Sequence, residues 1–372
     1  MKNTFKQYKM IGLMTGTSMD GLDLSASKIK FIDDSISIDV IKNGYVKFPK
    51  KLRFEIEKSL NLDKDQINLC HKNLGQFMAS ETYKFLLKNK ISNIDGVGVH
   101  GQTIQHISRV KSLQVGDPKY LFKKLNVPII SNFRNSDIKN GGTGAPLVPF
   151  LDKIFFQEKN NSVLCINIGG IANVTFLPSL KSNKDILGFD TGPGMSLIDE
   201  AAKIFFNIEF DKDGFLCLKG NPNFKLVEKW MKDDFINSSI PKSTGRYEFG
   251  LNWLKKNMNI LKNMNKNNIL PTLALFTSKS IIFNCKNFLD FKNIKKIIIS
   301  GGGIYNAAIL QNLKNNFKNI SFHISDDLGI DSFSKEALCF ALLGAAFLNN
   351  TPGNIPSVTG ASKPIILGEM TK

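Results

Sequence analysis

The sequence predicts a two-domain α/β protein with a cleft between its domains. Each half of the chain begins with an apolar strand, a glycine-containing turn and a second strand, and strands alternate with helices in both halves. At 372 residues the chain also exceeds the roughly 250–300 residues at which a single hydrophobic core stops growing. We therefore expect one α/β domain over residues 1–160 and another over residues 161–372, with ligands bound between them.

The first half opens with a hairpin. Residues 8–14 form an apolar run, a polar turn rich in Gly, Thr, Ser and Asp follows, and residues 22–27 alternate apolar with small or polar side chains at the period of a strand. The spacing predicts a further strand pair from 36–38 to 44–46, a helix over 64–88, and extended segments at 96–99, 103–105 and 127–130.

The second half repeats this pattern. Residues 163–168 form a buried-strand run, Gly169-Gly170 turns the chain, and residues 172–177 return. Downstream, we expect a solvated Lys/Asn/Met-rich stretch over 255–268, a helix over 272–288, a strand over 296–300, and a last helix over 334–348 with Ser334 near its N-cap.

The charge and cysteine content exclude several functional classes. The net charge is +17, but the lysines are scattered along the chain and form no basic arm, so we expect no nucleic-acid partner. The five cysteines are far apart, without a C-x-x-C pair, which is typical of free thiols in a reducing compartment. No apolar run reaches the roughly 18 residues of a membrane span. The sequence therefore predicts a cytoplasmic protein that does not contact membranes.

Two common nucleotide-binding motifs are excluded. No Gly-Lys dipeptide occurs, so the chain has no Walker A loop. A formal G-x-G-x-x-G occurs at Gly96, Gly98 and Gly101, but an extended segment follows it where a dinucleotide fingerprint requires a helix.

Three other glycine-rich turns each end an apolar strand: residues 12–21, Gly169-Gly170 and Gly301-Gly302-Gly303, with Gly192-Pro193-Gly194 as a fourth. Glycine lets backbone N–H groups approach an anion closely. In the first turn, Thr15, Thr17 and Ser18 add hydroxyl groups, and Asp20 and Asp23 add carboxylates that could hold Mg²⁺ through water. Any one of these is also explained as an ordinary tight turn, whereas the set favours a nucleotide cleft.

Single polar residues supply candidates for catalysis. Asp190 ends a strand and precedes Thr191-Gly192-Pro193-Gly194, where a carboxylate could act as a general base or merely cap the turn. Glu336 lies in the first turn of the last helix, where acids are favoured by the helix dipole in any case. Arg134 could bind a carboxylate or lie on the surface, and His100, beside Gly101, Gln102 and Thr103, could bind a ligand or be structural.

The chain resembles the anhydro-N-acetylmuramic acid kinases, which belong to the actin-like superfamily of sugar kinases, Hsp70 and actin. The resemblance runs in order from the first strand to the C-terminus. Its segments are GLMTGTSMDGLD at residues 12–23, VHGQTIQH at 99–106, LQVGDP at 113–118, GGTGAPLVP at 141–149, NIGGIAN at 167–173, GFDTGPG at 188–194, PKSTGR at 241–246, SGGG at 300–303, KEA at 335–337 and GNIPSVTGA at 353–361. It implies a duplicated actin-like ATPase (ribonuclease H-like) fold.

The resemblance also implies a reaction. Such enzymes hydrolyse the 1,6-anhydro bond of anhydro-N-acetylmuramic acid and phosphorylate O6 with ATP, giving N-acetylmuramic acid 6-phosphate in peptidoglycan recycling. By this likeness Asp190 is the catalytic base, and ATP and Mg²⁺ are required, with Asp20 holding the metal through water. The family also suggests a homodimer. The residues implied for ATP and its phosphates are Gly16, Thr17, Ser18, Met19, Asp20, Gly21, Leu22, Asp23, Gly169, Gly170, Gly301, Gly302 and Gly303, and those for the sugar are His100, Gln102, Thr103, Arg134 and Glu336.

Three residues depart from the family pattern. Thr143 stands where Gln is usual, Met195 where Asn is usual and Asn132 where Asp is usual. They leave open a kinase of a related anhydrosugar or sugar. A non-catalytic nucleotide-dependent binding module on the same fold is a second alternative, since fold alone does not set function. A base at Asp190 argues against it, because a pure switch needs no base aimed at a sugar.

Overall fold

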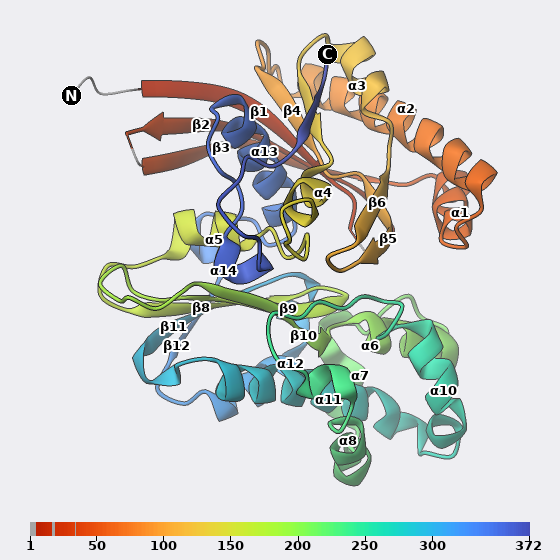
Figure 1. Cartoon of the computed structure of the whole chain (residues 1–372). Helices are drawn as coiled ribbons and strands as arrows, with labels where there is room; N and C mark the ends of the chain where they lie inside the picture. The colour runs from red at the N-terminus through yellow and green to blue at the C-terminus, as the bar shows by residue number, and fades with distance from the viewer. Residues whose placement is uncertain (1–4, 17–18, 34) are drawn as a thin grey trace. The chain divides into compact units, whose positions relative to one another are not determined.

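The structure is a computed structural model that describes residues 5–16, 19–33 and 35–372. The chain forms two compact units, one of residues 1–155 and 334–372 and one of residues 156–333. Residues 334–372, expected in the second domain, cluster with the first unit. In Figure 1 the blue C-terminal helix α13 accordingly lies among the red strands from the N-terminus.

The first unit is built on a six-stranded sheet with the order β13-β7-β4-β1-β2-β3, and on a β5-β6 hairpin. The strands β1 and β2 and the strands β2 and β3 pair antiparallel, whereas β4 runs parallel to β1 and β7 parallel to β4. The strands are β1 (Phe5–Met14), β2 (Gly21–Ile32), β3 (Ser35–Lys47), β4 (Gly96–Val99), β5 (Gln102–Ile107), β6 (Lys111–Val115), β7 (Ile129–Ser131) and β13 (Glu369–Thr371). The strand pair expected over 36–46 is wrong: the segment is the single strand β3, which pairs along its length with β2.

Helices cover both faces of this sheet. Alternate side chains of β1 and β2 pack with Leu74 and Met78 of α2 in one apolar core. The opposite face carries Gly12 and Gly98, against which α13 packs. The helices are α1 (Lys50–Ser59), α2 (Lys64–Lys88), α3 (Pro118–Leu125), α4 (Phe133–Ile138), α5 (Pro149–Phe156), α13 (Lys335–Leu348) and α14 (Pro356–Thr359). The helix expected over 64–88 is confirmed, and its start is fixed by Asp63, which accepts a hydrogen bond from the Gln66 amide.

The second unit repeats the same topology. Its sheet has the order β10-β9-β8-β11-β12, again with two antiparallel pairs followed by two parallel ones. The strands are β8 (Ser162–Ile168), β9 (Ile171–Leu177), β10 (Leu187–Pro193), β11 (Ile294–Ser300) and β12 (Ser321–Ile324). This repetition confirms the duplicated α/β fold expected of actin-like ATPases.

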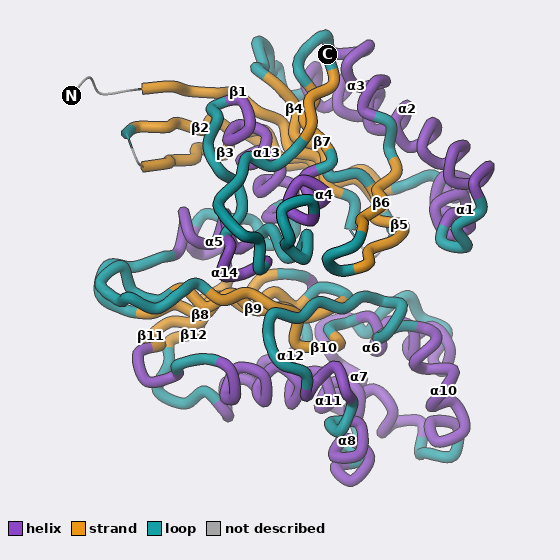
Figure 2. The backbone as a smooth tube through the Cα atoms, viewed as in Figure 1, coloured by secondary structure: helices purple, strands orange, loops and turns teal. Residues whose placement is uncertain are grey.

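The helices of the second unit gather on one face of its sheet, as Figure 2 shows for α7, α8, α10, α11 and α12. They are α6 (Ser196–Ala201), α7 (Phe215–Lys219), α8 (Phe224–Trp230), α9 (Asp234–Asn237), α10 (Leu251–Lys262), α11 (Lys266–Phe288) and α12 (Ala307–Asn316), with short 3₁₀ turns at Lys212–Gly214, Phe291–Asn293, Gly302–Tyr305 and Ser325–Leu328 and a π-turn at Ala202–Phe206. The exposure expected over 255–268 is confirmed, since Leu261 is the one buried residue of that stretch, and the structure adds that its first part belongs to the helix α10. In the described part of the chain no helix combines the length and apolarity that a membrane crossing requires.

Candidate functional site

Asp190 lies in β10, where the ladder with β9 is interrupted. The pairing register shifts between Asp190 and Gly192, and Gly192 has a φ of 129°, which favours glycine. Such bulges commonly redirect a side chain next to a site. Asp190 is 8% exposed. The strand end expected at Asp190 is therefore a break in the regular pairing with β9, and the positive φ of Gly192 makes this break possible.

A loop of residues 241–246, here called the clamp segment, holds Asp190. The Asp190 amide donates to the Lys242 carbonyl (3.2 Å). The Ser243 hydroxyl and the Thr244 amide both donate to Asp190 Oδ2, at 2.9 and 2.8 Å. Hydrogen bonds to an ionised carboxylate are stronger than neutral ones. The carboxylate is thus fixed in one orientation. Sequence reasoning missed the role of Ser243 and Thr244, because only the resemblance drew attention to this segment.

The side chain of Lys242 is buried beneath the clamp segment. Its Nζ donates to the Phe235 and Ile236 carbonyls at 3.0 and 2.8 Å. It also lies over the Phe235 and Phe288 rings, 5.1 and 5.2 Å from their centroids. Burial lowers the pKa of Lys242 to about 8, although the charges of Asp190 and Asp233 act in the opposite direction.

The Gly169-Gly170 turn is bonded to the residues that follow β10. The Gly169 carbonyl accepts from Met195 N (2.8 Å), and the Gly170 carbonyl accepts from Gly194 N and Ser196 N (3.0 and 3.1 Å). A Cβ on Gly194 would lie 2.2 Å from the Gly169 oxygen, so this approach requires glycine. The structure thereby brings the turn close to the strand that carries Asp190.

The three glycines after β11 have different surroundings. A Cβ on Gly301, whose φ is 83°, would lie 2.7 Å from the Ile168 carbonyl, and one on Gly303 would lie 2.2 Å from the Ile168 side chain. A Cβ on Gly302 would meet nothing within 4 Å. Gly301 and Gly303 therefore allow close packing on β8, and Gly302 is the one of the three that borders open space.

The turn between β1 and β2 belongs to the first unit. The predicted phosphate contacts Thr17 and Ser18 lie outside the described residues. Met19 has a φ of 52°, and its amide donates to the Gly16 carbonyl (3.1 Å). The Asp20 carbonyl accepts from Phe48 N (2.8 Å), while Gly21, Leu22 and Asp23 begin β2. The Thr15 hydroxyl is buried and has no hydrogen-bond partner among the described residues.

Asp20 and Asp23 both lie near the Tyr45 side chain. The Tyr45 phenol is hydrogen-bonded to Asp20, and its pKa is raised to about 12 by burial and then by the charges of the two carboxylates. The Tyr45 ring covers Gly21, where a Cβ would lie 2.4 Å from it. The described residues hold no cluster of three or more metal-ligating side chains. Two neighbouring carboxylates nevertheless suit Mg²⁺, which combines one or two of them with water and phosphate oxygens.

Arg134 of α4 lies beside two of the predicted sugar-binding residues of the first unit, His100 and Glu336. Its Nε donates to His100 Nε2 (2.9 Å), and its Nη1 donates to the Gly144 carbonyl (2.9 Å). His100 Nδ1 lies 2.7 Å from the Gly101 carbonyl, so we assign the ring proton to Nδ1. Burial, and secondly the Arg134 charge, lower the pKa of His100 well below its usual value. His100 is therefore neutral and oriented.

Glu336 lies in the first turn of α13, within the field of Arg134. Burial raises the pKa of its carboxyl group, and the charges of Arg134 and Lys335 partly offset this. The neighbouring Lys335 pairs with Asp152 of α5 at 2.6 Å, and the two side chains are 4% and 3% exposed. The start of the helix that carries Glu336 is thus held by a buried ion pair.

Gln102 and Thr103 begin β5. Gln102 is buried, and its Oε1 has no hydrogen-bond partner among the described residues. Thr103 Oγ1 accepts from Gln114 Nε2 (3.3 Å). His106, which sequence reasoning did not select, belongs to the same hairpin: its Nδ1 lies 3.1 Å from Ser112 Oγ. Burial and then the Arg134 charge lower the pKa of His106 to about 4.

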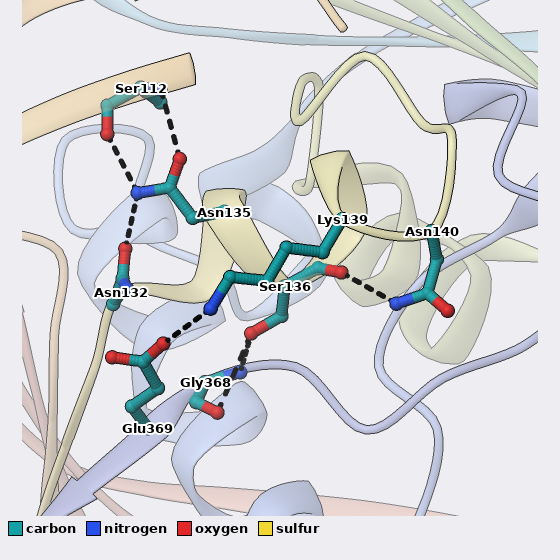
Figure 3. A network of polar contacts seen from close by, with 8 residues as sticks. All are labelled: Ser112, Asn132, Asn135, Ser136, Lys139, Asn140, Gly368 and Glu369. Carbon is teal, nitrogen blue, oxygen red and sulfur yellow. Dashed lines mark hydrogen bonds and ion pairs between the residues drawn. The ribbon is translucent and has the colours of Figure 1, made fainter. Parts of the chain in front are cut away.

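Two of the departures from the family pattern have structural partners. Asn132 precedes α4 with a φ of 57°, which Asn tolerates better than most residues. It accepts a hydrogen bond from Asn135 Nδ2 (2.6 Å), and Asn135 in turn bonds to the backbone of Ser112 (Figure 3). The Asn132 amide also donates to Glu369, a hydrogen bond that lowers the pKa of that carboxyl group and that an aspartate could not make.

Thr143 is tied to the C-terminal segment. Its hydroxyl donates to the Ala145 and Thr359 carbonyls, at 2.7 and 3.1 Å. Nearby, the fully buried Asp137 accepts from the Thr359 hydroxyl and the Gly144 amide, both at 2.8 Å. These contacts order the loop whose Gly144 carbonyl receives Arg134. The third departure, Met195, packs against the core of the second unit.

Comparison with known proteins places the chain in a family. Residues 8–372 match the family model described as anhydro-N-acetylmuramic acid kinase. The chain is 35% identical over 374 residues to the anhydro-N-acetylmuramic acid kinase of a Bacillus cereus strain, covering 97% of this chain and 98% of that protein. It is 35% identical over 373 residues to the enzyme of that name from Clostridioides difficile (strain 630), covering 97% of each.

A solved structure with a lower likeness is the activator of the 2-hydroxyisocaproyl-CoA dehydratase from Clostridium difficile with bound ADPNP. It is 12% identical to this chain, covers 89% of it and 96% of its own length, and has a TM-score of 0.41. The full-length match to the family model and to its curated relatives is the decisive comparison. The chain belongs to the anhydro-N-acetylmuramic acid kinase family, a family of ATP-dependent sugar kinases.

Proposed function

We propose that this protein hydrolyses the 1,6-anhydro bond of 1,6-anhydro-N-acetylmuramic acid and phosphorylates O6 with ATP, giving N-acetylmuramic acid 6-phosphate. The observation that carries the proposal is the match to relatives of that name over almost the whole length of both chains. A full-length match supports the complete reaction rather than a shared nucleotide-binding domain alone.

In this proposal Asp190 is the general base. Its carboxylate takes a proton from a water molecule, whose oxygen attacks the anomeric carbon as the bond from that carbon to O6 breaks. The released O6 takes the γ-phosphoryl group of ATP, so the leaving oxygen needs no general acid. The two hydrogen bonds to Asp190 Oδ2 from Ser243 and Thr244 support this role, because they hold the carboxylate in one orientation.

We propose that the sugar contacts are His100, Gln102, Thr103, Arg134 and Glu336. Arg134 is suited to the lactyl carboxylate, since its planar guanidinium can bind a carboxylate through two N–H groups. Its hydrogen bonds to His100 and Gly144 orient it for this purpose. The buried Gln102 Oε1, which has no partner among the described residues, is suited to accept a hydrogen bond from a sugar hydroxyl or amide.

We propose that ATP phosphates contact residues 16–23 and the Gly169-Gly170 turn, and that the nucleotide lies beside Gly301–Gly303. The open space next to Gly302 and the buried Thr15 hydroxyl support these assignments. Asp20, with Asp23 beside it, would hold Mg²⁺, which when bound offsets the negative charge of the phosphates. The same proposal includes a cytoplasmic homodimer that acts in peptidoglycan recycling, and light scattering of the purified protein tests the dimer.

The reaction is tested by incubating the protein with Mg-ATP and 1,6-anhydro-N-acetylmuramic acid and measuring N-acetylmuramic acid 6-phosphate by mass spectrometry. Asp190→Asn should reduce kcat by about 10²–10⁴-fold, the usual contribution of a general base. The matched control is Asp185→Asn, which changes an exposed residue just before β10 and should leave kcat unchanged. Folded, ATP-binding protein that makes no product would contradict the proposed reaction, and full turnover by Asp190→Asn would contradict the base.

A further inference from the structure

We propose that Lys242 is a positioning residue that orients the Asp190 carboxylate through the clamp segment. The inference rests on the proposed role of Asp190 as the base, and adds a residue that does not touch the reacting atoms. Three consecutive residues of this segment form hydrogen bonds with Asp190.

Residues 242–244 hold Asp190 at its backbone and its side chain together. The Lys242 carbonyl accepts from the Asp190 amide, while the Ser243 hydroxyl and the Thr244 amide donate to Oδ2. These contacts can be made at the same time only if the loop keeps its position relative to β10. Residues 241–246 lie outside any helix or strand, so no ladder of backbone hydrogen bonds provides that restraint.

The Lys242 side chain supplies the restraint from below the loop. Its Nζ donates two hydrogen bonds to carbonyls of α9 and lies over the rings of Phe235 and Phe288. The Phe235 carbonyl also accepts from the Ser238 amide and hydroxyl, whereas the Ile236 carbonyl lies near the helix end, where carbonyls lack partners within their helix. Aromatic faces attract a cation as well. The residue is 7% exposed, so its ammonium group is enclosed by these partners. Lys242 thereby fastens the clamp segment to α9.

The positive charge of Lys242 also draws the Asp190 carboxylate toward the clamp segment. The charges of Asp190 and Asp233 raise the lysine pKa against the larger effect of burial, so the ammonium group and the Asp190 carboxylate attract each other. Two further titratable groups lie near this pair: Tyr247, whose pKa Asp190 helps to raise, and Glu248, which accepts a hydrogen bond from Thr244. A base must be ionised before it can accept a proton, so position and charge both serve the proposed step.

The experiment compares Lys242→Met and Ser243→Ala with the unaltered protein in steady-state kinetics. Methionine keeps the aliphatic stem and removes the ammonium group. We expect kcat to fall about 10–100-fold in each variant, as for the loss of a hydrogen bond to a charged group, with the KM values for ATP and sugar changed less than about twofold. Lys242→Arg, which keeps the charge, should recover part of kcat. Lys256→Met, at an exposed position on α10, is the control and should leave kcat unchanged.

A double variant separates positioning from a general loss of stability. Because Lys242 acts through Asp190, adding Lys242→Met to Asp190→Asn should lower kcat no further. If Lys242→Met does not fold, Ser243→Ala decides, since it removes only one hydroxyl group. If Asp190→Asn is inactive but both Lys242→Met and Ser243→Ala keep kcat within about twofold, the positioning role alone is overturned. If Asp190→Asn keeps full turnover, the base proposal fails as well.

Discussion

Replacing Gly98 with alanine should displace α13 from the sheet of the first unit. A Cβ at Gly98 would lie 1.9 Å from the Phe340 carbonyl oxygen, whereas ordinary contacts begin near 3.4 Å. The strand or the helix must therefore move by about 1.5 Å. The obstacle is backbone of α13, which no rotamer change can relieve, and Gly12 of β1 meets the same helix at Ala337 in the same way.

The size of the effect follows from this clash. Overpacking a well-packed core costs about 1–3 kcal/mol, and we expect the upper part of that range because α13 contacts β1, β2 and β4 together. For a unit of this size each kcal/mol lowers Tm by about 2–4 °C, so Gly98→Ala should lower Tm by roughly 4–12 °C.

The assay is thermal unfolding followed by circular dichroism, with Gly302→Ala as the matched control. A Cβ at Gly302 meets no atom within 4 Å, so this variant should keep its Tm. If Gly302 borders the nucleotide as proposed, the KM of the Gly302→Ala variant for ATP should rise. A Tm for Gly98→Ala within about 1 °C of the unaltered protein would refute the packing argument.

Two further predictions concern buried charges in the first unit. Lys335→Met leaves the buried Asp152 carboxylate without its partner and should cost about 3–5 kcal/mol, whereas the double variant Lys335→Met/Asp152→Leu should recover most of that loss in urea unfolding. A double variant as unstable as the single one would show that the ion pair is not the cause. The His106 pKa is lowered from 6.5 in the unfolded chain to about 4 in the folded one, so its contribution of about 1–3 kcal/mol is complete above pH 6.5 and is lost as the pH falls toward 4. Urea unfolding at pH 4.5 and 7 should show a smaller pH effect for His106→Gln, and an unchanged pH effect would contradict this origin.

Much of the secondary structure could be predicted from local patterns. The helix over 64–88 and the two strand–turn–strand hairpins were predicted because their apolar periodicity is regular and their turns contain glycine. The strand pair expected over 36–46 was wrong, because pairing along β2 holds this segment in one continuous strand, and the local pattern does not show that partner.

The candidate site could also be predicted only in part from the sequence. Asp190, Arg134, His100 and Glu336 could be selected from the resemblance, but their partners could not. Ser243 and Thr244 are more than fifty residues from Asp190 along the chain, and His106 becomes notable only because Arg134 lies nearby. Hydroxyl and amide groups are common in loops, so their presence in a sequence does not show which carboxylate they will bind.

The duplicated α/β fold and the family follow from the amino-acid sequence, since periodicity and ordered motifs are properties of the chain in its own order. The membership of residues 334–372 in the first unit became visible only in the folded chain, where α13 reaches the sheet through Gly12 and Gly98. The G-x-G-x-x-G that begins in β4 thus contains a helix-packing glycine, Gly98. Close approach, burial and shared hydrogen bonds depend on distances between residues remote in sequence, and a linear pattern does not contain those distances.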